Sequence, residues 1–209
     1  MASCCSCRKP EKFKGNHPYK VSVHVQGQRL LLEVDSVQVL EHVLDAPLPQ
    51  GQFGLFAWGK TSVEFTSISV NEKQGSVFVI MKFSEPYQTF YTDVINQVIA
   101  DKKYNLRAHH AGEIFGPGII LKDIERSIID AKIVIAEITE INANVFYELG
   151  YSHALRKPTI ILSERGKGEL PFDVRGHRCL FYDNTIGGKG QVQAALRKHL
   201  DAILQVIRP

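Results

Sequence analysis

Hydrophobic and polar positions follow two different periods along the chain, and the change falls at the polar stretch 71–75. Before it, short segments alternate with period two between Gly, Pro, Asp or Gln residues, a pattern typical of β-strands joined by turns. After it, apolar strand-like runs alternate with segments of helical period, as in βα units. The pattern predicts a disordered tail over 1–17, an antiparallel β region over 18–72 and an α/β domain over 76–209.

The β region is expected to be a meander of about five strands. The pairs Gly27-Gln28 and Asp35-Ser36 are expected to form hairpin turns. So few strands cannot close a complete sandwich. One apolar face must therefore be covered by the second domain, by another subunit or by residues outside this sequence. The five predicted strands are YKVSVHV, QRLLLEVD, SVQVLEHVL, QFGLFAW and SVEFTSISV.

The second region predicts a flavodoxin-like, doubly wound parallel sheet of five strands. Pro86 at a first-turn position, with Ser84 as its cap, marks the start of the first helix. Ligands of such sheets bind outside the carboxyl ends of the strands. The strands are expected at 77–81, 104–108, 133–136, 159–162 and 179–182, and helices at 86–100, 119–130, after residue 144 and at 191–207.

The most informative segment is 132–155, where a continuous apolar strand leads through a polar turn into a helix. Glu137 and Thr139 follow the strand, and Asn144 is expected to cap the helix. Glu148 would then lie in the first turn, where the macrodipole favours its ionised form. Tyr151 shares its face. Glu148 fits an anionic nucleophile for displacement at an anomeric carbon, and it equally fits a glutamate that only complements the helix dipole.

Other polar residues leave similar alternatives open. Asp123 would position substrate or share a proton with Glu148, or be an ordinary first-turn acid. Glu113 would bind a ribose hydroxyl, or be loop surface. His109 and His110 are adjacent on a strand and point to opposite faces, so they do not make a metal pair. No Cys/His spacing supports zinc, so neither a metal nor a cofactor is expected.

Composition is that of an ordinary soluble protein, with 209 residues, 44% hydrophobic and 22% charged. The net charge of +3 argues against a dedicated nucleic-acid surface. No apolar window is long enough to span a membrane, and the N-terminus lacks the apolar core of a secretory signal. Three of the four cysteines crowd the N-terminal tail, at Cys4, Cys5 and Cys7, which does not fit a disulfide framework. The expected compartment is the cytoplasm.

The end of the β region resembles the last strands of concanavalin-like jelly rolls. The shared pattern is G-x-x-G-L-x-A-W, here Gly51, Gly54, Leu55, Ala57 and Trp58. Trp58 and its neighbour Phe56 are expected to belong to a core rather than to a carbohydrate platform.

Residues 76–205 resemble the nucleoside 2-deoxyribosyltransferase-like group, which overlaps with TIR-like nucleotide-binding domains. The matching runs are VFVIMKFSEPY, EIFGPGIILKDIERSI and IVIAEITEINANVFYELGYSHALRKPTIIL. In the transferases the glutamate of the Y-E-L-G motif is the nucleophile that takes up the sugar, and here that position is Glu148. The resemblance also implies that Asp123 on the preceding helix assists.

The resemblance further implies that the loop after the first strand contacts base or phosphate. The substrate-binding residues predicted at the carboxyl edge are Phe83, Ser84, Tyr87, Glu113, Gly116, Gly118, Glu137, Thr139, Asn144 and Tyr151. The chain departs from its relatives at Lys82, where proline is usual, and at Gly112, where many carry aspartate. Active transferases are oligomers in which a neighbour completes the pocket, so a homo-oligomer is expected, with residues 183–185 in that part.

Two functions from different classes follow. The first is an N-glycosidase or N-(deoxy)ribosyltransferase that cleaves the base–sugar bond of a nucleoside, nucleotide or NAD-like substrate. The second is a non-catalytic nucleotide sensor that uses the same pocket. A third interpretation, an assembly module, rests on the exposed face expected for the β region.

Overall fold

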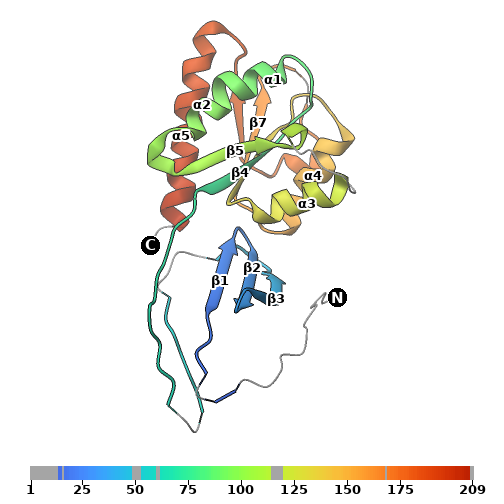
Figure 1. Cartoon of the computed structure of the whole chain (residues 1–209). Coiled ribbons are helices and arrows are strands. Elements are labelled where there is room, and N and C mark those ends of the chain that lie inside the picture. The colour runs from blue at the N-terminus through green and yellow to red at the C-terminus, as the bar shows by residue number, and fades with distance from the viewer. Residues whose placement is uncertain are drawn as a thin grey trace.

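The computed structural model describes residues 14–15, 17–48, 53–59, 62–113, 120–167 and 169–207. It contains a three-stranded antiparallel sheet and a five-stranded parallel sheet with helices on both faces (Figure 1). The expected fold class, an α/β domain preceded by a small antiparallel meander, is confirmed.

The parallel sheet has the strand order β5-β4-β6-β7-β8, which is the predicted flavodoxin-like order. β6 is central, and all five of its residues are buried. Its neighbours β4 and β7 pair with it in parallel. The strands are β4 (Gly75–Ile80), β5 (Leu106–His110), β6 (Ile133–Glu137), β7 (Thr159–Glu164) and β8 (Cys179–Tyr182).

Two helical layers cover the sheet and form two separate cores. One face carries a continuous helical segment, made of α1 (Tyr87–Phe90), the π-helical turn η1 (Tyr91–Ile95) and α2 (Asn96–Ile99), together with α5 (Ile186–Ile207). The other face carries α3 (Ile120–Asp130) and α4 (Ala143–Ala154). Short 3₁₀ turns lie at η2 (Lys102–Tyr104), η3 (Ala111–Glu113) and η4 (Phe172–Val174).

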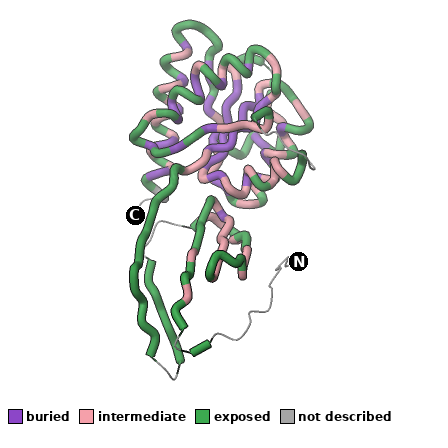
Figure 2. The backbone as a smooth tube through the Cα atoms, in the orientation of Figure 1, coloured by how far each residue is buried: buried purple, intermediate pink, exposed green. Residues whose placement is uncertain are grey.

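The central strand divides its side chains between these two cores. Ile133 and Ile135 pack in the core beneath α1, α2 and α5, whereas Val134 and Ala136 pack in the core beneath α3 and α4. Successive residues of a strand point to opposite faces, so an uninterrupted apolar run is what a doubly covered strand needs. Figure 2 shows this burial concentrated in the α/β part of the molecule.

Two element boundaries differ from the expectations for a local reason. α5 begins at Ile186 rather than at residue 191, because the Thr185 hydroxyl accepts a hydrogen bond from the Gly188 amide at 3.0 Å and caps the helix. The glycines near the start of α5 have low helix propensity, so propensity alone does not show where the helix begins. α1 begins at Tyr87, whose amide donates to the Ser84 carbonyl at 2.9 Å, and the Glu85 carboxylate accepts from the Thr89 amide at 3.3 Å.

The meander has three strands, so the expectation of about five was wrong. β1 (Val21–Gln26), β2 (Arg29–Val34) and β3 (Val37–Val43) pair antiparallel through the two predicted turns. Within the described residues, 53–59 and 62–70 form no strand. Trp58 is 94% exposed and Phe56 87% exposed, which contradicts their expected place in a core. No described segment pairs with theirs to cover them, and Gly51 lies outside the described residues.

The β1–β2 turn docks on the carboxyl ends of α3 and α4. The last carbonyls of a helix have no partner within the helix. The amide nitrogen of Gln28 donates to the Ile129 carbonyl at 3.0 Å, and its side-chain amide donates to the Leu155 carbonyl at 2.9 Å. Gln28 is fully buried, so the turn packs closely against the two helix ends, and we call it the plug. The outward valines of β1, Val21 and Val23, remain exposed.

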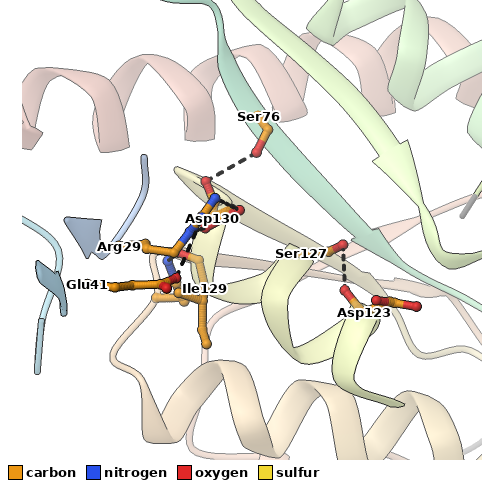
Figure 3. A network of polar contacts seen from close by, with 8 residues as sticks. Arg29, Glu41, Ser76, Asp123, Ser127, Ile129 and Asp130 are labelled. Atoms are coloured by element: carbon orange, nitrogen blue, oxygen red, sulfur yellow. Dashed lines mark hydrogen bonds and ion pairs between the residues drawn. The ribbon is translucent and has the colours of Figure 1, made fainter. Parts of the chain in front are cut away.

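An ion-pair network beside the plug fixes its orientation (Figure 3). The guanidinium of Arg29 donates to both carboxylate oxygens of Asp130, at 2.7 and 2.6 Å, and lies 3.7 Å from Glu41. The hydrogen bond to Asp130 raises the pKa of Arg29. A bidentate pair of this kind is geometrically specific. It joins the second strand of the meander to the end of α3.

We predict that Gly27→Ala strongly destabilises this junction. Gly27 has φ +57°, and a Cβ there would overlap the Ile129 carbonyl oxygen and lie 2.7 Å from the Asp130 carbonyl oxygen. Gly166→Ala is the matched control, since Gly166 has φ +78° but no atom within 4 Å of such a Cβ. The control should lose about 1–2 kcal/mol of unfolding free energy in urea, and Gly27→Ala at least about 2 kcal/mol more. Equal losses of unfolding free energy in the two variants would contradict the close packing of this turn against the end of α3.

Candidate functional site

Glu137 is a buried carboxyl group at the carboxyl end of the central strand. It shares the face of Ile133 and Ile135, toward α1 and α5. The Tyr182 hydroxyl donates to its Oε1 at 3.1 Å, and the Thr139 amide donates to the same atom at 3.2 Å. The Thr139 hydroxyl also bonds this oxygen. The structure therefore brings together Glu137 and Thr139, two residues that the sequence predicted for the site.

Burial raises the pKa of Glu137 to about 6, although the hydrogen bonds from Thr139 and Tyr182 oppose the shift. Thr139 in turn accepts from the Glu164 amide at 2.7 Å, which ties the loop after β6 to the end of β7. Sequence reasoning missed Tyr182. The signal was its place as the last residue of a predicted strand, which puts it at the same sheet edge.

The loop after β4 borders this network. Tyr87 is buried, and its pKa is raised by that burial and by the carboxylates of Glu137 and Glu140. Lys82 forms an ion pair with Glu140. This pair links the loop after β4 to the loop after β6. Ser84 lies at the start of α1 and is half-buried.

A second polar cluster holds Glu113 at the end of β5. The Tyr91 hydroxyl donates to Glu113 Oε1 at 3.0 Å, and His110 Nε2 lies 3.2 Å from the same oxygen. The Gly112 amide donates to His110 Nδ1 at 3.1 Å. Because Nδ1 accepts, Nε2 carries the proton of a neutral imidazole and donates to Glu113. Burial lowers the pKa of His110, in agreement with the neutral form.

An aromatic surface lies next to that cluster. The ring of Phe83 packs against the ring of His110 with centroids 5.0 Å apart, and Phe83 is 44% exposed. A Cβ at Gly112 would lie 3.0 Å from both rings, so a larger residue there would press against them. His109 packs instead against Phe78, on the opposite face, as predicted. Sequence reasoning missed Tyr91 and His110 as partners of Glu113.

Glu148 lies in the second turn of α4, one turn later than predicted. The helix cap is Asn142, whose side-chain oxygen accepts from the amides of Asn144 and Val145 at 3.0 and 3.3 Å. The prediction of Asn144 as the cap was therefore wrong. Both asparagines are good caps two residues apart, and local pattern does not choose between them. Asn144 lies inside the helix with an exposed side chain.

The environment of Glu148 favours its neutral form. Burial alone raises its pKa to about 7, which overturns the expectation that the helix dipole keeps it ionised. The dipole acts mainly within the first turn. Among the described residues, none makes a hydrogen bond or ion pair with its carboxyl group. Glu148 is only half-buried, so part of the residue is exposed to solvent.

The remaining predicted residues occupy different places. Tyr151 is half-buried and lies near Glu125, to which Tyr147 donates at 3.3 Å. Asp123 lines a cavity of about 240 Å³ beside the meander, and Glu148 does not line it. Asp123 is not among the causes of the Glu148 pKa shift, so their shared proton stays a prediction. Gly116 and Gly118 lie outside the described residues.

No protein-family model matches the chain, and no curated protein matches it in sequence. Solved structures do resemble it. CMP N-glycosidase BcmB from Clostridium botulinum aligns at 17% identity and a TM-score of 0.45, covering 57% of this chain and 98% of that chain. The 2-deoxyribosyltransferase from Leishmania mexicana aligns at 14% identity and a TM-score of 0.42, covering 60% and 98%.

The lysine decarboxylase LdcF from Francisella novicida also aligns, at 14% identity and a TM-score of 0.39, over 64% of this chain and 18% of that one. At such identities and TM-scores these likenesses carry no argument about activity, which must come from the residues of this chain. Within the described part of the chain, no helix combines the length and hydropathy needed to cross a membrane.

The raised pKa of Glu137 predicts a pH-dependent stability. Its folded pKa of about 6 lies above the ordinary 4.5, so its stabilising contribution is present below about pH 4.5 and is lost as pH rises through about 6. Glu137→Gln keeps an acceptor for Tyr182 and Thr139 but cannot ionise. Relative to wild type, the variant should gain about 2 kcal/mol of unfolding free energy between about pH 4.5 and pH 7.5.

The control is Glu169→Gln, whose side chain is 89% exposed in an ion pair with Arg175. Urea unfolding at a series of pH values measures all three proteins. If the unfolding free energy of Glu137→Gln changed with pH in parallel with that of the control, the raised pKa of the buried Glu137 carboxyl group would be contradicted.

Proposed function

We propose that the chain cleaves the base–sugar bond of a nucleoside, nucleotide or NAD-like substrate, with Glu148 as the nucleophile. The observation that carries this proposal is the half-buried carboxyl group of Glu148, which no described residue bonds and whose pKa burial raises to about 7. Perturbed ionisable groups of this kind are typical of functional sites. Its place in the Y-E-L-G motif supports the assignment.

The chemistry is a double displacement. The Glu148 carboxylate attacks C1′, the bond from C1′ to the base nitrogen breaks, and its electron pair leaves with the base. A neutral nucleobase takes up a proton from water as it leaves, whereas a cationic nicotinamide leaves as a neutral base without one. The transition state resembles an oxocarbenium ion, so a fixed negative charge stabilises it. Water or a second base then attacks C1′ and releases Glu148, which gives hydrolysis or transfer.

The half-neutral state of the free carboxyl group suits this role. A carboxylate without hydrogen-bond donors is poorly stabilised, so positive charge that develops on the sugar interacts strongly with it. The same argument favours a substrate that already carries positive charge, such as a nicotinamide or a protonated base. Asp123 remains a proposed assistant, although it lines the cavity beside the meander and Glu148 does not.

Glu113 is proposed to bind the ribose. Tyr91 and His110 both contact its Oε1, so Oε2 is left to accept from a sugar hydroxyl. Phe83 beside it offers an exposed aromatic face on which a base can stack. The other proposed substrate-binding residues are Ser84, Tyr87, Gly116, Gly118, Glu137, Thr139, Asn144 and Tyr151.

Assembly into a homo-oligomer is part of the proposal. Residues 183–185 lie between β8 and α5, and Asp183 forms an ion pair with Arg165 at 3.4 Å. Arg165 follows β7, so this turn lies at the same sheet edge as Glu137. A neighbouring copy would use it to complete the pocket.

Base release tests the proposal. Wild type, Glu148→Gln and the exposed control Glu169→Gln are incubated with nucleosides, nucleoside monophosphates and NAD, and free base is measured by chromatography. Glu148→Gln should lose about 10³-fold or more of the rate, because an amide cannot form the glycosyl ester, while the control keeps it. Equal rates would reject the nucleophile. Substrate binding without base release in wild type would instead indicate the nucleotide sensor.

The pH profile gives a second prediction. A nucleophilic carboxylate must be deprotonated, so kcat/KM should rise with pH through about 7, the pKa of Glu148 in the free protein. Initial rates of base release from about pH 5 to about pH 9 measure it. A kcat/KM that falls over this range would assign Glu148 the role of a general acid and contradict the nucleophile.

A further inference from the structure

A second cavity, of about 300 Å³, lies at the amino edge of the sheet, away from Glu137 and Glu148. It lies where α4 ends and where β7 and β8 begin. Its lining is strongly basic, with five side chains that carry or can carry positive charge: His153, Arg156, Lys157, His177 and Arg178.

These charges are not balanced by the protein. None of the residues lining the cavity is acidic. Among the described residues, none forms an ion pair or a side-chain hydrogen bond with Arg156 or Arg178. The ammonium group of Lys157 donates to the carbonyls of Ile129 and Ala131, at 2.5 and 2.8 Å, and the carboxylate that acts on it is Asp130. The carboxyl end of α4 supplies only about half a negative charge.

The two histidines of this cavity can change their charge when an anion binds. Their rings are stacked, with centroids 4.2 Å apart and planes inclined by 18°. Burial lowers the pKa of His153, and the neighbouring His177 lowers it further. Two protonated rings at this separation repel each other unless an anion lies beside them. The cavity thus places two guanidinium groups that are always charged, those of Arg156 and Arg178, beside a pair of imidazole rings that can gain protons.

We propose that this cavity binds a phosphate-bearing anion of the size of pyrophosphate, through Arg156, Arg178 and the stacked histidines. The planar guanidinium group matches phosphate oxygens in a bidentate manner, which a lysine cannot do. Protonation of His153, whose pKa burial lowers in the free protein, accompanies binding, so binding tightens as pH falls. The other charged groups around the two histidines are Arg156, Lys157, Arg178 and, behind Lys157, Asp130.

The test is calorimetric titration of the full chain with inorganic pyrophosphate at about pH 6 and about pH 8. Arg156→Gln and Arg178→Gln remove exposed side chains, so folding is retained. Each should weaken binding about tenfold or more. The matched control is Arg126→Gln, an arginine of the other cavity, where Asp123 and Asp130 already supply negative charge. It should bind as wild type does.

Nuclear magnetic resonance supplies an independent readout. The pKa of His153 should rise when pyrophosphate is added, and this rise should be lost in Arg178→Gln. Absence of binding at both pH values, or equal affinity in Arg178→Gln and Arg126→Gln, would overturn the proposal.

The source of the phosphate is found by repeating the titration with ADP and with adenosine, in the Glu148→Gln variant. Binding of ADP that depends on Arg178 identifies a nucleoside diphosphate as the ligand. Binding of pyrophosphate without such ADP binding identifies an inorganic anion. Adenosine should give no heat that depends on Arg178. None of these results depends on the activity proposed for Glu148.

Discussion

Burial of β6 on both faces is the constraint on which the rest of the structure depends. Successive side chains of β6 point alternately into the two cores, so helices must lie on both sides of the sheet. Pairing with β4 and β7 places the carboxyl ends of these strands at one edge. The same alternation turns Glu137 toward α1 and α5, while the chain crosses to the other face to begin α4. Glu137 and Glu148 therefore lie in different layers of the domain.

Those glutamates share a physical property. Among the described residues, neither forms an ion pair with a cation, and in each case burial raises the pKa, to about 6 for Glu137 and about 7 for Glu148. Their surroundings differ. Glu137 accepts hydrogen bonds from Thr139 and Tyr182 and so belongs to a rigid network that links β6, β7 and β8. Glu148 lacks any such bond to a described residue, which leaves its carboxyl group available to a substrate. We therefore propose a positioning role for Glu137 and a chemical role for Glu148.

The sequence predicted the parallel sheet, its strand order and both meander turns, because burial and turn chemistry are local patterns. It did not predict what depends on packing between distant segments. Tyr91 and His110, which hold Glu113, come from different elements that only the fold brings together. Asp123 lines the cavity beside the meander, which the sequence did not predict because spacing along α3 does not fix how the helix is rotated. Trp58 is exposed because no described strand covers it, although its segment has strand-like periodicity.

The central claim is that Glu148 forms a covalent bond to the sugar. Its most direct test is mass spectrometry of protein quenched with acid during turnover, using a nucleoside with fluorine at C2′ to slow the second displacement. The account predicts a mass increase equal to one fluorinated glycosyl group, mapped to the peptide that contains Glu148 and absent from Glu148→Gln. An adduct on another residue, or base release by Glu148→Gln at the rate of wild type, would contradict it.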